Sequence, residues 1–160
     1  MPQLAELFPS SAAAGEALRV HGWTVAVAES CTGGLLGAVL TAVPGSSAWV
    51  RGGVIAYDNA LKTDQLGVDS ELIAAHGAVS QEVGSAMARG ARERLGADVG
   101  IGITGVAGPG AEGGKPAGLV YVAIASPGGE RAVRLEGDRG REGNRANAVR
   151  VALDLLEEAS

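Results

Sequence analysis

Residues 28–34, AESCTGG, place two hydroxyls, a thiol and two glycines at one point of the chain. They follow the apolar run 24–28 and precede the apolar run 35–43, so a strand is expected to become a helix here. The first turn of a helix offers unpaired amide N–H groups that suit a phosphate or the oxyanion of an acyl-transfer intermediate. Ser30 could therefore act as a nucleophile. Alternatively, Ser30 or Thr32 merely caps the helix and the glycines turn the chain, and the spacing alone leaves both interpretations open.

A serine nucleophile needs a base, and neither histidine is well placed to be one. His21 is expected at a helix end and His76 directly before a glycine. A lysine can replace histidine if burial or a neighbouring positive charge lowers its pKa, and a tyrosine can pass the proton between the two. Tyr57 and Lys62, in the segment YDNALK after an apolar strand, are therefore the candidates. By residue type alone, a lone lysine is more often a solvated surface group.

Cys31 is a rival nucleophile. A thiol at a helix N-terminus would be acidified and reactive, although a small buried cysteine is the commoner outcome. One cysteine cannot form an intrachain disulfide, and two isolated histidines with one cysteine make no recognisable metal set. We therefore expect no metal site.

A second site-like stretch, residues 104–118, is too rich in glycine to form regular structure. Ordinary connections are about 4–6 residues long, and longer ones are often functional, although this one could also be a loose surface excursion. The pattern G-x-G-x-x-G occurs at residues 100–105. It is not a dinucleotide fingerprint, because its first two glycines lie inside a predicted strand and no helix opens at Gly105.

The elements that must position these residues alternate along the chain. Apolar patterns predict helices over 10–20, 33–43, 60–66, 70–76 and 80–95, a C-terminal helix, and strands over 24–28, 52–57, 98–104, 118–126 and 131–137. Early alternation followed by adjacent strands predicts a single α/β domain over residues 1–160, with a mixed β-sheet flanked by helices on both faces. In such sheets, ligands gather at the carboxyl ends of the strands.

Composition excludes several classes of partner. A net charge of −5 argues against a phosphate-neutralising surface, so nucleic acid is not expected to be a partner. No apolar run is long enough to cross a membrane, and the N-terminus lacks the pattern of a signal peptide. We therefore expect a cytoplasmic protein with no membrane partner.

Six ordered motifs, from about Trp23 onward, resemble the CinA C-terminal-domain family. They are AESCTGG, GSSAWVRGG, YDNALK, HGAVS, TGVAGPG with KPAGLVYVA, and GDR before the last helix. The resemblance implies a single α/β domain, often oligomeric, with nicotinamide mononucleotide amidohydrolase activity. The products would be nicotinate mononucleotide and ammonia, with no metal or organic cofactor. In many relatives this domain follows a larger nucleotide-hydrolysing domain.

The resemblance also implies roles for individual residues. Ser30 corresponds to the nucleophile, and Tyr57 and Lys62 lie beside it as the base. The substrate-binding residues that it implies are Thr32, Gly33, Gly34, Ser46 or Ser47, Asn59, Thr104, Gly105, Arg139 and Arg145. Among these, the amides of Thr32 to Gly34 would stabilise the oxyanion, while the 104–110 loop and an arginine would hold the ribose and phosphate. The rival expectation is a non-catalytic nucleotide-binding or regulatory module linked to competence.

Overall fold

Strand β1 (Val25–Glu29) lies inside a five-stranded sheet with the order β2-β1-β3-β4-β5. The computed structural model describes residues 2–159. Strands β2 (Val50–Ile55) and β3 (Val99–Gly105) both run parallel to β1, whereas β4 (Val120–Ser126) and β5 (Gly129–Leu135) continue the sheet as an antiparallel meander. The sheet is therefore mixed, as the order of predicted elements indicated.

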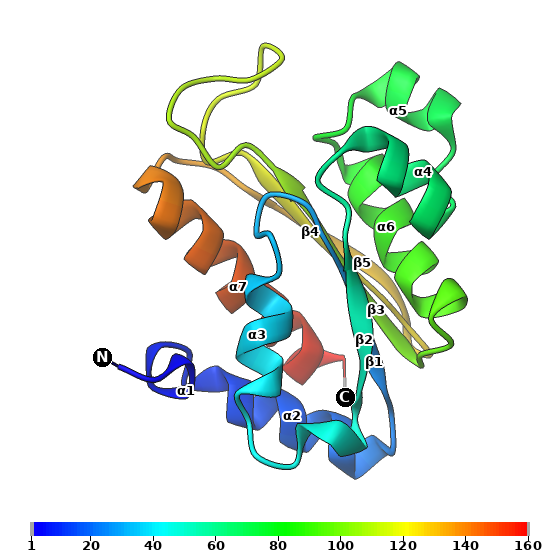
Figure 1. Ribbon diagram of the computed structural model, residues 1–160, viewed down its shortest axis with the longest axis vertical. Helices are drawn as coiled ribbons and strands as arrows, with labels where there is room; N and C mark the ends of the chain where they lie inside the picture. Colours follow the sequence, from blue (N-terminus) through cyan, green and yellow to red (C-terminus); the bar gives the residue numbers. More distant parts are fainter. Residues whose placement is uncertain (1, 160) are drawn as a thin grey trace.

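Helices cover both faces of the sheet (Figure 1). One face carries the short α1 (Leu4–Leu7), α2 (Ser10–His21), α3 (Leu35–Thr41) and α7 (Gly140–Glu158). The other face carries α4 (Asn59–Leu66), α5 (Ser70–His76) and α6 (Gln81–Arg94), and a 3₁₀ turn, η1 (Ser46–Ala48), precedes β2. The predicted α/β architecture with helices on both faces is confirmed.

Side-chain alternation along β1 connects the two halves of the core. Val25 and Val27 pack with the buried residues of α2, α3 and α7, whereas Ala26 and Ala28 pack with those of α6. This is the two-residue period of a strand that is buried on both faces. Because β1 is held on both sides, the residue that follows it has a well-defined position.

The glycines of β3 allow α6 to lie directly on the sheet. A Cβ at Gly100 would lie 2.0 Å from the Ala88 carbonyl oxygen, and one at Gly102 would lie 2.3 Å from the Gly84 carbonyl oxygen. Both glycines lie inside the strand, which confirms that this pattern is not a dinucleotide-binding turn. Their function is close packing.

Replacing Gly100 with alanine should destabilise the fold by about 1–3 kcal/mol, because the added methyl group forces α6 away from β3. Gly128 provides a matched control. It lies in the turn between β4 and β5, where a Cβ would be 3.6 Å from Ser126 Oγ, an ordinary contact. Gly128→Ala should change stability by less than about 0.5 kcal/mol. Urea unfolding of both variants is the measurement, and equal effects would contradict this packing role.

Two boundaries near the site differ from expectation. Helix α3 begins at Leu35 rather than at Gly33, because Gly33 and Gly34 have φ angles of 59° and 101°, outside the helical region. Strand β2 begins at Val50, where it pairs with Val25, and ends at Ile55. The residues that follow β2 therefore form a separate connection that enters α4.

Candidate active site

The ends of three neighbouring parallel strands form one pocket of about 430 Å³. β1 leads to Ser30, β2 leads to the segment 57–62, and β3 leads to the glycine-rich loop 106–118. The predicted site residues in the pocket wall are Ser30, Tyr57, Asn59, Lys62, Thr104 and Gly105. They meet at the carboxyl edge of the sheet, where α/β proteins usually bind their ligands.

Lys62 is buried in the wall of this pocket. Asp58 caps α4 by accepting a hydrogen bond from the Ala60 amide, and the lysine on the first turn of that helix points back toward the sheet. Its side chain is only 1% exposed, and Lys62 Nζ lies 3.1 Å from Ser30 Oγ. Burial lowers the pKa of Lys62, and the negative charge of Asp58 opposes this only in part.

The other contacts of Lys62 direct its nitrogen toward the serine. Nζ donates hydrogen bonds to the carbonyl oxygens of Ala56, at 2.8 Å, and Tyr57, at 3.3 Å. Asn59 Oδ1 lies 3.5 Å from the same nitrogen. A neutral amine that donates to both carbonyls keeps its lone pair for the Ser30 hydroxyl proton. The arrangement can therefore support general-base activation of Ser30.

Tyr57 lies at the mouth of the pocket rather than between Ser30 and Lys62. Its side chain is 59% exposed, and its hydroxyl accepts a hydrogen bond from Arg141 at 3.3 Å. Lys62 contacts Tyr57 only through the tyrosine carbonyl. The direct contact between Ser30 and Lys62 can pass a proton without a tyrosine between them.

The start of α3 is occupied by a carboxylate of this chain. Glu29 is buried, and its two oxygens accept hydrogen bonds from the amides of Leu36, at 2.9 Å, and Gly37, at 3.0 Å. The Gly33 amide donates to the Ser30 carbonyl at 3.0 Å. These amides are therefore not free to bind an external anion, and Thr32, Gly33 and Gly34 do not line the pocket.

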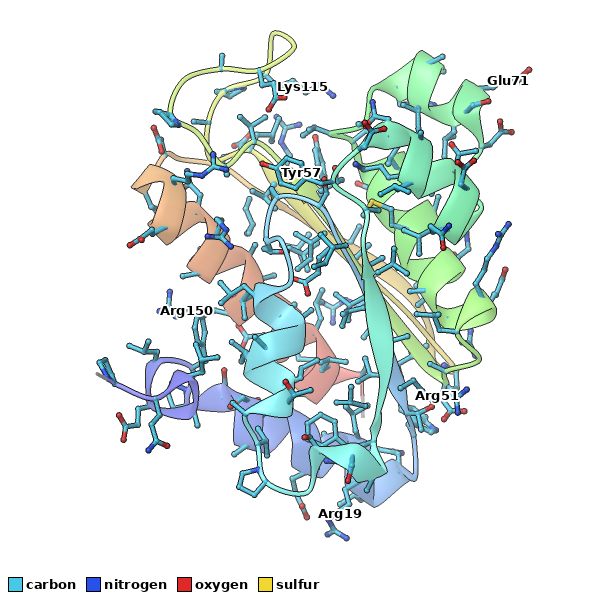
Figure 2. All side chains as sticks on the ribbon, viewed as in Figure 1. Arg19, Arg51, Tyr57, Glu71, Lys115 and Arg150 are labelled. Atoms are coloured by element: carbon cyan, nitrogen blue, oxygen red, sulfur yellow. The ribbon has the colours of Figure 1, made fainter. Side chains whose placement is uncertain are left out.

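The glycine-rich loop is tied to the rest of the pocket. Thr104, at the end of β3, donates its hydroxyl to the Ala78 carbonyl at 2.7 Å. Lys115 reaches from the loop to the carbonyls of His76, at 3.3 Å, and Val79. Figure 2 shows the labelled Lys115 and Tyr57 at the same end of the molecule. These contacts argue against a loose surface excursion.

Four further residues implied by the resemblance also lie outside the pocket lining. Ser46 and Ser47 belong to η1, which precedes β2 and therefore lies at the opposite edge of the sheet (Figure 1). The Arg139 side chain donates to the carbonyls of Glu136 and Gly137, and Arg145 donates to the Thr32 carbonyl at 2.9 Å. Arg145 therefore contacts the turn after Ser30 from outside the pocket.

Two residues in the first turns of α7 were missed by sequence reasoning. Arg141 lines the pocket and donates to the Gly108 carbonyl. Asn144 is buried, donates to the Ala107 carbonyl at 2.9 Å and accepts from the Arg139 amide at 2.8 Å. The two side chains are three residues apart, and this spacing could have indicated a common helix face. These two hydrogen bonds, to Gly108 and Ala107, connect α7 to the glycine-rich loop.

Cys31 also lines the pocket, but its thiol is not activated. Burial raises the pKa of Cys31 to about 11, so the thiolate form is rare at neutral pH. This finding favours Ser30 over the rival thiol. Across residues 2–159, no three His, Cys, Asp or Glu side chains lie together as a metal set. Within the same residues, no helix has the length and apolar character needed to cross a membrane.

Fold and site together define an α/β protein whose parallel strands end in a pocket with a buried serine–lysine pair. Comparison with known protein families identifies the family to which this α/β protein belongs. The model of the CinA C-terminal domain matches residues 8–160, and the chain belongs to this family.

Individual relatives agree with this assignment. A CinA-like protein of Gloeobacter violaceus is 54% identical over 151 residues, which cover 91% of this chain and 35% of the relative. A CinA-like protein of Gemmatimonas aurantiaca is 57% identical over 139 residues, covering 85% and 32%. The chain thus spans about a third of the length of these relatives. The solved structure of competence/damage inducible protein CihA from Agrobacterium tumefaciens has a TM-score of 0.91 at 38% identity, covering 96% of this chain and 94% of that chain.

Proposed function

We propose that this protein hydrolyses the carboxamide of nicotinamide mononucleotide to nicotinate mononucleotide and ammonia. The observation that carries the proposal is the buried contact of 3.1 Å between Lys62 Nζ and Ser30 Oγ in a pocket of about 430 Å³. A pocket of this volume falls within the usual range for small-molecule sites. The family resemblance supplies the substrate.

In the first half of the reaction, Ser30 Oγ attacks the carboxamide carbon while Lys62 Nζ takes the hydroxyl proton. The resulting oxyanion needs N–H donors. Among residues 31–34, Cys31 lines the pocket, so we place an oxyanion donor at its backbone amide, whereas the Gly33 amide is bound to the Ser30 carbonyl. Lys62 then returns the proton to the departing nitrogen, and ammonia leaves an ester on Ser30.

In the second half of the reaction, a water molecule enters the position that ammonia has left and hydrolyses the ester on Ser30. Lys62 is neutral again after ammonia has left, and it can take a proton from the water molecule that attacks the ester. The carbon–oxygen bond to Ser30 breaks, the serine oxygen regains its proton, and nicotinate mononucleotide is released. Neither half requires a metal ion or an organic cofactor.

The proposal extends to the organisation of the protein. We infer a single amidohydrolase domain that assembles as a homo-oligomer and acts in the cytoplasm on a pyridine nucleotide. Asn59 lies 3.5 Å from Lys62 Nζ, which supports a role in orienting the lysine. Thr104 and Gly105 form part of the wall that would face the nucleotide.

Incubation of the purified protein with nicotinamide mononucleotide should release ammonia and nicotinate mononucleotide in equal amounts. Ammonia is measured with a coupled glutamate dehydrogenase assay, and the nucleotide product by chromatography. A control without protein corrects for spontaneous hydrolysis. Binding of the nucleotide without ammonia release would instead favour the non-catalytic nucleotide-binding module.

A further inference from the structure

The pocket has a reactive end and an exposed end. Ser30 and Lys62 are buried, whereas Tyr57, Glu112 and Arg141 are exposed parts of the same wall. In nicotinamide mononucleotide, the carboxamide and the phosphate lie at opposite ends of the molecule. A substrate whose carboxamide reaches Ser30 therefore directs its phosphate toward the exposed end.

Arg141 is the cation at that end. Its guanidinium donates to the Gly108 carbonyl and to the Tyr57 hydroxyl, and these two contacts leave further N–H groups for a ligand. Arg19, Arg89, Arg131 and Arg134 each pair with a glutamate, but in the part of the chain that the structure describes no carboxylate pairs with Arg141. Its positive charge is therefore not neutralised by an ion pair.

The helix that carries Arg141 is bound to the glycine-rich loop. Asn144, one turn further along α7, hydrogen-bonds the Ala107 carbonyl, so α7 and the glycine-rich loop form one wall. Glu112 is the carboxylate in the pocket lining, and it would repel an anion placed beside it. An anion should therefore bind on the side of the pocket formed by Arg141 and the Tyr57 hydroxyl.

We propose that Arg141, together with the Tyr57 hydroxyl, forms the subsite that recognises the phosphate of the substrate. This inference rests on the proposed function, because it takes the carboxamide end of the ligand to be at Ser30. It assigns recognition to Arg141, whereas the resemblance implied Arg139 and Arg145. Arg141 is thus a specificity residue and takes no part in the proton transfers.

The test compares nicotinamide mononucleotide with nicotinamide riboside, which lacks the phosphate. The wild type should have a kcat/KM for the riboside about 10- to 100-fold lower, as expected for the loss of one charge-assisted hydrogen-bonded contact. Arg141→Met should lower kcat/KM for the mononucleotide by a similar factor and leave that for the riboside within about twofold. Arg141→Lys should be intermediate, because lysine keeps the charge but loses the planar fork.

Arg150→Met is the matched control, because Arg150 lies on the same helix with its guanidinium carbon 5.1 Å from the centre of the Phe8 ring. Figure 2 shows it beside α1, away from Tyr57. This variant should keep the wild-type ratio between the two substrates. A merely structural role for Arg141 would lower both substrates equally, and an unchanged ratio in Arg141→Met would overturn the subsite.

Titration calorimetry separates this inference from the proposed function. If the wild type releases no ammonia from either compound, the proposed function fails. The subsite still stands if the mononucleotide binds the wild type about 10-fold or more tightly than Arg141→Met. Equal affinities for the two proteins, or no binding to the wild type, would overturn it.

Discussion

Lys62→Met should leave a folded protein that still binds nicotinamide mononucleotide but turns it over about two to four orders of magnitude more slowly, the range for loss of a general base. Methionine retains much of the length and apolar stem of lysine, so it can occupy the buried position of Lys62 beside Ala56. It cannot accept the Ser30 proton. Lys62→Arg should fail too, because the guanidinium stays protonated.

The pH dependence gives this prediction a definite sign. Burial lowers the pKa of Lys62 below the ordinary value of 10.5, and only the deprotonated amine can accept the serine proton. The rate should therefore rise with pH through the pKa of Lys62 and fall as pH decreases below it. This acidic limb should be absent from any residual activity of Lys62→Met.

The measurement is kcat against pH for the wild type and both variants, with nucleotide affinity from calorimetry. Near-normal turnover by Lys62→Met with unchanged binding would exclude lysine as the base. The alternatives would then be Glu29 or His76. Both carboxylate oxygens of Glu29 already accept amides of α3, so His76 would be examined first.

Ser30→Ala should abolish deamidation, with a loss of several orders of magnitude in kcat, whereas Cys31→Ala should retain most of it. The two residues are adjacent and both line the pocket, so they form a matched pair. Of these two residues, Ser30 is the one whose side chain contacts Lys62 Nζ. The Cys31 thiol stays protonated at neutral pH because burial raises its pKa to about 11.

The assay is ammonia release by both variants, with circular dichroism to show that each is folded. An active Ser30→Ala together with an inactive Cys31→Ala would show that the thiol is the nucleophile. In that case the serine mechanism would be wrong. Loss of activity in both variants with native spectra would show that the Cys31 side chain is also needed in the pocket.

Local patterns were sufficient for most of the fold. The apolar runs around Val27, Ile101 and Ile124 predicted strands, because continuous apolar segments of this length fit a sheet covered on both faces. The amphipathic pattern of residues 80–95 corresponds to α6, Gln81–Arg94. The short helix α1 was not predicted, since four residues carry no usable periodicity.

The candidate site was harder to predict from the sequence than the fold. Residue type alone left Lys62 as an ordinary surface lysine, and the family resemblance was needed to select it. Its contact with Ser30 joins residues 32 positions apart and arises only when β1 and β2 pair. The position of Arg141 likewise depends on how α7 packs against the 106–118 loop, which no local pattern encodes.

The pairing of β1 with β3 determines how this site can pass from one protein to another. Val25 lies opposite Val99, so the strand that ends at Ser30 is held in place by a strand from the second half of the chain. The lysine comes from the segment between these strands, and the arginine comes from the last helix. No contiguous segment shorter than residues 25–141 contains all of these parts. Gene fusion or domain shuffling can therefore transfer this site only as an intact unit.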